Sequence, residues 1–277
     1  MAAAALKLGL IGGNIALSNA PRLHRLAGAL SGLSVSYDLL VPSALGLDLD
    51  AMLDRCRAER YRGVNVTYPY KEAAAARVAI PDPLVAAIGA VNTVLFEPDG
   101  PVGHNTDHSG FVGVLRDAFG PAVPGPVCMV GCGGVGRAIA FALVRCGVAD
   151  VRLVDSDPAR AGGLADALGR AGFGGSVRVC AAVGEAARGA AGLVNCTPVG
   201  MDGHPGTPVP PAAMAGAAWA FDAVYTPRDT LFLQDAAAAG LRVIEGYALF
   251  FRQGVDAGAL VSGRPVDPAA LRAALAA

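Results

Sequence analysis

The sequence predicts an α/β fold with two domains, and three observations support this. The chain has 277 residues, more than the roughly 100–200 residues of a typical single domain. Short apolar runs of strand length alternate with segments of helical spacing, a pattern typical of βαβ units and mainly parallel sheets. The turn-rich stretch PAVPGP at residues 121–126 precedes a second series of strands and helices.

The composition indicates a compact globular protein. Hydrophobic residues make up 53% of the chain and charged residues 16%, which allows a large buried core and argues against disorder. The net charge is −1 with no basic or acidic block, so we expect no nucleic-acid partner. The six cysteines form no CxxC pair and no Cys/His cluster with zinc spacing, so we expect no metal.

Three features of the sequence favour a cytoplasmic protein without a membrane segment. The N-terminal stretch MAAAALKLGLIGG is apolar but lacks the basic region and cleavage site of a signal peptide. No uncharged apolar run of about 18 residues suggests a membrane span. The scattered cysteines are typical of buried thiols in a reducing compartment.

In the first half of the chain, strands and helices alternate and are followed by a hairpin. Pro21, preceded by Ser18 and Asn19, is a signal for the start of a helix. A PDG turn between VNTVLFE and PVGHNTD predicts the hairpin. Strands are expected over residues 7–12, 35–42 and 63–69, helices from near 21, over 47–61, 71–79 and 108–120, and the hairpin over 91–107.

The second half begins with a buried strand that runs into a glycine turn, a helix and another strand. These are expected over residues 127–157, where Asp155 ends the second strand. The remaining strands are expected over 177–182, 192–198, 219–225 and 241–246, with helices between them and over 247–263 and 268–277.

The segment GCGGVG at residues 131–136 matches the G-x-G-x-x-G pattern of a dinucleotide-binding turn. Gly131 allows the tight turn, Gly133 allows the backbone to approach a pyrophosphate, and Gly136 allows the helix to pack close to the strand. Gly134 and Val135 lie at the helix N-terminus, where free N–H groups attract phosphates. The pattern alone is weak, but its position between a strand and a helix strengthens it.

Asp155 favours NAD over NADP as the cofactor. A carboxylate at this position accepts hydrogen bonds from a ribose 2′-hydroxyl and repels a 2′-phosphate. Ser156 and Asp157 follow, and the first basic residue is Arg160. Arg160 keeps NADP open as the less favoured cofactor.

The chain resembles the shikimate dehydrogenase family along nearly its whole length. The matching stretches, in order, are IALSNAPRLH, GVNVTYPYK, GAVNTV, GHNTDHSGF, GCGGVGRAIAFAL, VNCTPVGM, DAVYTPRDT and EGYALFFRQGVDA. The Asp-Ser-Asp run at 155–157 resembles the NAD-preferring quinate/shikimate branch. The resemblance implies reversible oxidation of a ring hydroxyl of shikimate or quinate, and a role in the aromatic amino acid (chorismate) pathway or in quinate breakdown.

The resemblance also implies roles for individual residues. Lys71 matches the catalytic lysine that handles the hydroxyl proton, and Asp107 matches its partner. Taken alone, Lys71 at a helix start would be an ordinary exposed charge. The motifs further imply substrate contacts from Ser18, Thr67, Asn92, Tyr225 and Gln253, and cofactor contacts from Thr197, Val224 and Gly246. His24, in the P-x-x-H helix, is expected to be structural.

Two departures from the family pattern keep alternatives open. Ala20 stands where the family usually has Ser or Thr, which removes a donor to the substrate carboxylate. The substrate could therefore be a modified ring, such as an amino-substituted one, or the chain could be a non-catalytic binding homologue. Bulky Tyr247, Phe250 and Phe251 replace the usual residues before the glutamine. A different two-domain dehydrogenase, acting on a folate or another small carbonyl compound, is a further alternative.

The expected organisation has two domains. Residues 1–107, completed by the C-terminal helices 247–277, are expected to form the substrate-binding domain. Residues 108–246 are expected to form the Rossmann-like NAD-binding domain with a parallel sheet. The expected partners are a small shikimate-like molecule and the cofactor, with no membrane, and a homodimer is left open.

Overall fold

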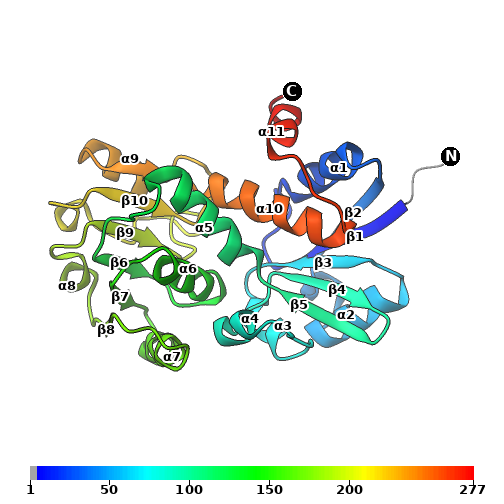
Figure 1. Cartoon of the computed structure of the whole chain (residues 1–277), viewed down its shortest axis with the longest axis horizontal. Coiled ribbons are helices and arrows are strands. Elements are labelled where there is room, and N and C mark those ends of the chain that lie inside the picture. The colour runs from blue at the N-terminus through cyan, green and yellow to red at the C-terminus, as the bar shows by residue number, and fades with distance from the viewer. Residues whose placement is uncertain (1–4) are drawn as a thin grey trace. The chain divides into compact units, whose positions relative to one another are not determined.

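The computed structural model describes residues 5–277 and divides into two compact units (Figure 1). Unit 1 combines the residues up to Ser109 with Phe251–Ala277, and unit 2 is Gly110–Phe250. The start of the apolar N-terminal stretch, residues 1–4, lies outside the described residues. Within residues 5–277, no helix has both the length and the apolarity needed to cross a membrane.

Unit 1 contains a five-stranded sheet in the order β2-β1-β3-β4-β5. β1 pairs in parallel with β2 and β3, whereas β3–β4 and β4–β5 are antiparallel. The antiparallel end arises because β4 and β5 form the hairpin that the PDG turn predicts. The strands are β1 (Ala5–Ile11), β2 (Ser34–Leu40), β3 (Gly63–Val66), β4 (Thr93–Glu97) and β5 (Gly100–His104).

Two helices of unit 1 differ from the sequence-based expectation. The helix expected over 71–79 ends at Ala75, because Ala79 instead pairs with β5, donating to Pro101 O and accepting from Gly103 N. A short helix was missed, although Asp82 and Pro83 carry its N-terminal signals. The helices are α1 (Ala20–Leu30), α2 (Leu49–Ala58), α3 (Lys71–Ala75), α4 (Pro83–Ile88), α10 (Gly246–Ser262) and α11 (Pro268–Ala276), with a 3₁₀ turn at Ser43–Leu45.

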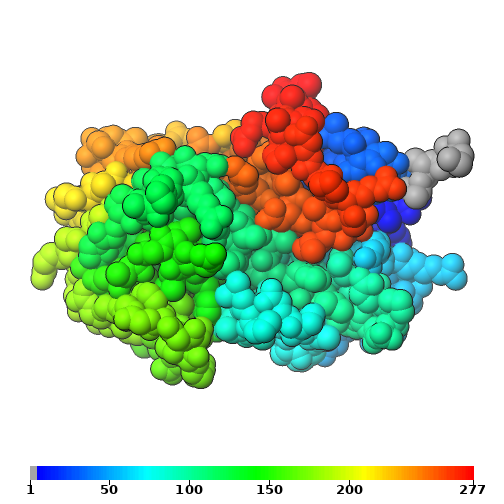
Figure 2. All heavy atoms as spheres, viewed as in Figure 1, coloured from blue at the N-terminus to red at the C-terminus, as the bar shows by residue number. Residues whose placement is uncertain are grey.

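The sheet of unit 1 is covered on both faces. On one face, side chains of α2, α3 and α4 form a single hydrophobic cluster with β1, β3 and β4. On the other face α1 and α10 pack closely, since a Cβ on Gly254 would lie 2.7 Å from the Leu23 side chain. Figure 2 shows the red C-terminal residues beside the blue residues of α1. The two ends of the chain therefore build one unit.

Unit 2 contains a six-stranded parallel sheet in the order β11-β10-β9-β6-β7-β8. This order reverses between β6 and β9, which is the switch point of a doubly wound dinucleotide-binding fold. The predicted α/β fold with a Rossmann-like parallel sheet is confirmed. The strands are β6 (Val127–Val130), β7 (Asp150–Val154), β8 (Ser176–Val179), β9 (Gly192–Asn195), β10 (Trp219–Asp222) and β11 (Arg242–Ile244).

Helices cover both faces of this sheet as well. The helices are α5 (Thr106–Phe119), α6 (Gly134–Arg145), α7 (Pro158–Arg170), α8 (Val183–Ala187) and α9 (Leu231–Ala238), with a 3₁₀ turn at Pro211–Ala213. α8 and α9 share one hydrophobic cluster with alternate residues of the central strands. α5 packs on the sheet through aromatic pairs, Phe111 with Phe221 at 4.6 Å and Phe119 with Trp219 at 5.3 Å between ring centroids.

His24 makes the stability of unit 1 dependent on pH. It is buried in α1 and stacks on Tyr37 with ring centroids 5.0 Å apart. Burial lowers its pKa to about 4, and a hydrogen bond with Asn65 opposes only part of this shift. The unfolded chain therefore binds more protons than the folded chain between about pH 6.5 and pH 4.

We expect the free energy of unfolding to fall by up to about 3 kcal/mol from His24 alone as the pH drops from about 7 to 4. His24→Phe should make this decrease smaller, as measured by urea unfolding at several pH values. The exposed His204→Asn is the control and should follow the wild type. Equal losses in the wild type and in His24→Phe would contradict the prediction.

Candidate active site

Lys71 and Asp107 form a largely buried ion pair in unit 1. Lys71 is the first residue of α3 and Asp107 lies in the first turn of α5. Lys71 Nζ lies 2.6 Å from Asp107 Oδ2, and the two side chains are only 14% and 6% exposed. The positive end of α5 stabilises the carboxylate. An ammonium held this way keeps two further hydrogens for a ligand.

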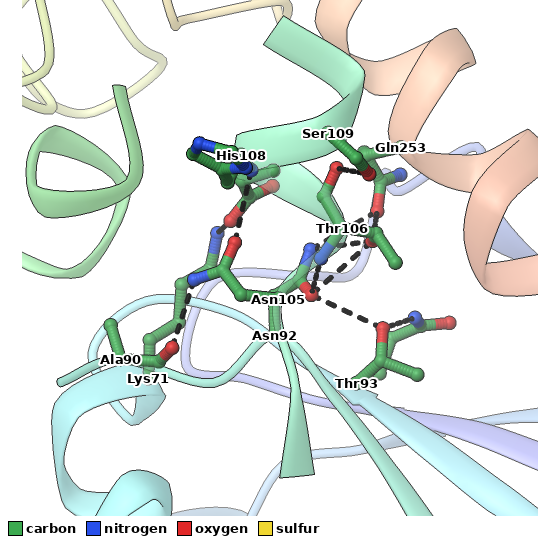
Figure 3. A network of polar contacts seen from close by, with 11 residues as sticks. Lys71, Ala90, Asn92, Thr93, Asn105, Thr106, His108, Ser109 and Gln253 are labelled. Atoms are coloured by element: carbon green, nitrogen blue, oxygen red, sulfur yellow. Dashed lines mark hydrogen bonds and ion pairs between the residues drawn. The ribbon is translucent and has the colours of Figure 1, made fainter. Parts of the chain in front are cut away.

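Asn92, Thr106 and Gln253 surround the same end of α5 (Figure 3). The Thr106 N–H donates to Asn92 Oδ1 at 2.8 Å, and Asn92 Nδ2 donates to Thr106 Oγ1 at 2.9 Å. Gln253 Oε1, on α10, lies 3.5 Å from Asn92 Nδ2 and 3.4 Å from Thr106 Oγ1. Ser109 donates to Asp256 one helical turn further along α10. A group of donors and acceptors thus lies beside the ion pair.

The other predicted substrate residues are placed as follows. Ser18 precedes α1, and its Oγ accepts from the Ala20 N–H at 3.2 Å, so its own hydrogen is available to a ligand. Thr67 follows β3, where its methyl group fits only because position 12 is glycine; a Cβ there would lie 2.5 Å from it. Tyr225 belongs to unit 2, where its ring stacks on Phe250 at 4.7 Å.

The glycine turn of unit 2 is closely packed at positions where a side chain would not fit. Gly131 has φ +97°, which other residues rarely adopt, and a Cβ there would lie 2.7 Å from the Cys196 backbone. A Cβ on Gly136 would lie 2.1 Å from Gly131 O. Gly133 is the N-cap of α6 and provides no side-chain cap, so nearby N–H groups of α6 can bind a phosphate. Gly134 and Val135 begin the helix.

Asp155 lies directly after β7 and is hydrogen-bonded to the glycine turn. Its Oδ2 accepts from the Cys132 N–H at 2.7 Å and its Oδ1 from the Asp157 N–H at 2.9 Å. Each oxygen retains a lone pair for a ribose hydroxyl. Burial, and secondarily Asp155, raises the pKa of the Cys132 thiol to about 12, so it adds no negative charge to the glycine turn. Arg160 is exposed in the first turn of α7.

A buried polar network connects the carboxyl ends of β9 and β10. Asp222 Oδ1 accepts from Asn195 Nδ2 at 2.8 Å and from the Val224 N–H at 2.9 Å, while Thr230 donates to Oδ2 at 2.6 Å. Burial raises the pKa of Asp222 to about 6, although these hydrogen bonds oppose the shift. Thr197 Oγ1 donates to Asn195 Oδ1 at 2.7 Å. The network orders the loops that carry Thr197 and Val224.

Gly246 completes this end of the sheet, since a Cβ there would lie 2.4 Å from Val224 O. Asn195, Asp222 and Thr230 were missed from the sequence. The signal that could have found the first two is a polar residue at the end of an apolar strand, in GLVN and WAFD. The described residues contain no group of His, Cys, Asp or Glu that could hold a metal ion.

Comparisons with known proteins agree with this architecture. The family model described as "Shikimate dehydrogenase substrate binding domain" matches residues 10–94. The "Quinate/shikimate dehydrogenase (NAD(+))" of Corynebacterium efficiens is 40% identical over 272 residues, covering 96% of each chain. The chain belongs to the shikimate dehydrogenase family.

Two solved structures of this family resemble the chain over almost its full length. Quinate dehydrogenase from Corynebacterium glutamicum, in complex with NAD, has a TM-score of 0.88 and 34% identity, covering 98% of this chain and 99% of that one. Shikimate 5-dehydrogenase from Thermus thermophilus, in complex with NADP(H) and shikimate, has a TM-score of 0.83 and 36% identity, covering 97% and 98%. The family resemblance inferred from the motifs is confirmed.

Gly136→Ala should weaken NAD binding at least about 10-fold, because a Cβ 2.1 Å from Gly131 O must displace the turn or the helix. Isothermal titration calorimetry with NAD⁺ measures the effect. Gly162→Ala on α7 is the matched control, since the added Cβ would meet no atom beyond its chain neighbours and the backbone of its own helix. Wild-type affinity in Gly136→Ala would contradict the assigned role of the turn.

Proposed function

We propose that this chain catalyses the reversible oxidation of a ring hydroxyl of quinate or shikimate with NAD. The observation that carries the proposal is the buried Lys71–Asp107 pair at 2.6 Å, set among Asn92, Thr106 and Gln253. Relatives named "Quinate/shikimate dehydrogenase (NAD(+))" cover 96% of the chain, and a quinate dehydrogenase solved in complex with NAD covers 98% of it, which supports the proposal. The alternatives of an amino-substituted substrate and of a binding homologue are not favoured by these relatives.

Lys71 is proposed to move the hydroxyl proton. As the alcohol is oxidised, its oxygen loses a proton and develops negative charge. Lys71 Nζ can take up that proton when neutral, and its N–H groups stabilise the developing charge. In the reverse direction the ammonium returns the proton to the carbonyl oxygen. Asp107 orients Nζ, because a hydrogen bond of 2.6 Å to a nearly buried carboxylate leaves it little freedom.

The neighbouring polar side chains are proposed to orient the ring. Asn92 and Asp107 would bind ring hydroxyls, and Thr67 would contact the ring beside them. Ser18 would donate to the substrate carboxylate. Gln253 and Tyr225 are proposed as further substrate contacts. Such groups reject an analogue that lacks the matching hydroxyl, because they would then remain buried and unpaired.

Unit 2 is proposed to bind NAD through the glycine turn at 131–136 and Asp155. The bound nicotinamide supplies the hydride acceptor. The two oxygens of Asp155 would accept hydrogen bonds from the ribose hydroxyls, and its charge would disfavour a 2′-phosphate. Thr197, Val224 and Gly246 lie at the carboxyl ends of β9 and β10 and at the start of α10, so they would complete the site. Arg160 remains the residue that would favour NADP.

The compartment and the oligomeric state are also proposals. Six free cysteines support the cytoplasm as the compartment. A homodimer is supported by β2, which is an edge strand of its sheet with Leu39 36% exposed. Light scattering of the purified protein would measure the oligomeric state.

The proposal is tested by absorbance of reduced nicotinamide with quinate and shikimate, each with NAD⁺ and NADP⁺. Turnover with NAD⁺ is the expected result, and the ratio of the two substrates assigns the preferred ring. Turnover with NADP⁺ alone would overturn the role of Asp155 as cofactor selector. Inactivity in all four combinations would overturn the proposed function.

Lys71→Ala should lower kcat by about 10²- to 10⁴-fold while NAD and substrate binding remain measurable, because the group that moves the proton is lost. Lys7 is the other lysine of the chain. It is paired with Glu59 near the surface, so Lys7→Ala is the matched control and should leave kcat unchanged. Near-normal turnover by Lys71→Ala would rule out the lysine as the proton carrier.

Ala20→Ser should lower KM for the carboxylate substrate. The family usually has a hydroxyl here, and a hydrogen bond to a charged group contributes about 1.5–3 kcal/mol. This corresponds to roughly 10- to 150-fold in affinity. Steady-state kinetics with quinate and shikimate measure the change, and Ala16→Ser, an exposed position before Ser18, is the control. A KM unchanged by Ala20→Ser would mean that the carboxylate does not bind at this position.

A further inference from the structure

Behind Asn92, a chain of hydrogen bonds runs through the interior of unit 1. Tyr37 donates to Asn65 Oδ1 at 2.8 Å, Asn65 Nδ2 donates to Thr93 Oγ1 at 3.0 Å, and Thr93 Oγ1 donates to Asn92 Oδ1 at 3.2 Å. Figure 3 shows the last part of this chain, between Thr93 and Asn92. The four residues come from β2, β3, β4 and the segment before β4.

The direction of each bond in this chain is determined. A backbone N–H can only donate, so the Asn92 side-chain atom that faces the Thr106 N–H must be the oxygen Oδ1 and not the nitrogen Nδ2. Thr93 therefore donates to this oxygen and accepts from Asn65 Nδ2, which leaves Asn65 Oδ1 to accept from the Tyr37 hydroxyl.

Both lone pairs of Asn92 Oδ1 are therefore occupied. One accepts from the Thr106 N–H at 2.8 Å and the other from Thr93 at 3.2 Å. Of the two hydrogens on Nδ2, one is donated to Thr106 Oγ1 at 2.9 Å, and the other faces Gln253 Oε1 at the longer distance of 3.5 Å, where a ring oxygen can replace it as the acceptor. Asn92 and Thr93 are 3% and 0% exposed, so water does not compete for these bonds.

We infer that Thr93 and Asn65 are positioning residues that make Asn92 act only as a hydrogen-bond donor to a ring oxygen. The inference rests on the proposed function and extends it to two residues that do not contact the substrate. A hydroxyl or carbonyl oxygen can accept from Asn92 Nδ2, whereas an ammonium group at the same ring position cannot. The arrangement therefore selects an oxygen-bearing ring over an amino-substituted one.

The test compares two substitutions of the same residue. Thr93→Val keeps the shape of the side chain and removes the hydroxyl, whereas Thr93→Ser keeps the hydroxyl and removes a methyl group. We expect Thr93→Val to raise KM for quinate or shikimate about 5- to 20-fold. The KM for NAD and kcat should change less than about 3-fold, because the lost contact is one of binding. Thr93→Ser should stay within about 3-fold in every parameter.

A packing role of Thr93 would give the opposite order, with Thr93→Ser impaired and Thr93→Val normal, and would overturn the inference. Equal KM values in the wild type and both variants would also overturn it. Asn65→Ala is the second variant should Thr93→Val fail to fold. It should raise KM in the same direction, because the Thr93 hydroxyl is then no longer oriented, and a wild-type KM in this variant would count against the inference.

A readout that does not need turnover separates this inference from the proposed function. The side-chain amide resonance of Asn92 in ¹⁵N NMR spectra should shift in Thr93→Val and remain in place in Thr93→Ser. A wild-type protein without turnover would refute the proposed function, while the amide resonance would still decide whether Thr93 orients Asn92. An unshifted resonance in Thr93→Val would overturn the inference in either case.

Discussion

The hydrogen bond from the Thr106 N–H to Asn92 Oδ1, at 2.8 Å, is the constraint on which the substrate side depends. It joins the residue before β4 to the first residue of α5. These two residues are close together because the antiparallel β4–β5 hairpin lies between them in the sequence. α5 therefore starts at one defined place, and the side chain of Asp107 meets Lys71. Asn105 assists by accepting from the His108 N–H at 3.0 Å as the cap of the same helix. Without this junction, the ion pair would have no fixed geometry.

The two units build their sites by different physical means. In unit 2 the backbone forms the site: glycines at 131 and 136 admit contacts that a Cβ would block, and α6 offers its N–H groups. In unit 1 the side chains form the site, and each needs partners to hold its orientation. Buried polar networks supply these partners in both units, around Asn92 and around Asp222. Such networks specify one arrangement because any unpaired buried donor is costly.

Most of the fold could be predicted from local sequence, and the two errors have different physical causes. Strands and helices of strong periodicity, such as β6, α6 and β7, lie where the pattern predicts them. The helix after Lys71 is shorter than its alanine-rich sequence favours, because Ala79 pairs with Pro101 and Gly103. The helix at Pro83–Ile88 has few residues, too few for periodicity to reveal. Tertiary pairing overrode helix propensity in the first case, and length concealed the signal in the second.

Local sequence is enough to identify the chemical groups: a lysine at a strand–helix junction, an Asp after the second strand of a glycine-turn unit, and a series of family motifs. These signals are local, or depend on motif order, so they can be read along the chain. Which of these groups come into contact depends on the three-dimensional packing of the elements that carry them. The Lys71–Asp107 contact joins residues on different elements, and the Tyr37–Asn65–Thr93–Asn92 chain crosses three strands. Its direction follows from donor and acceptor counting, which requires distances that no sequence pattern contains.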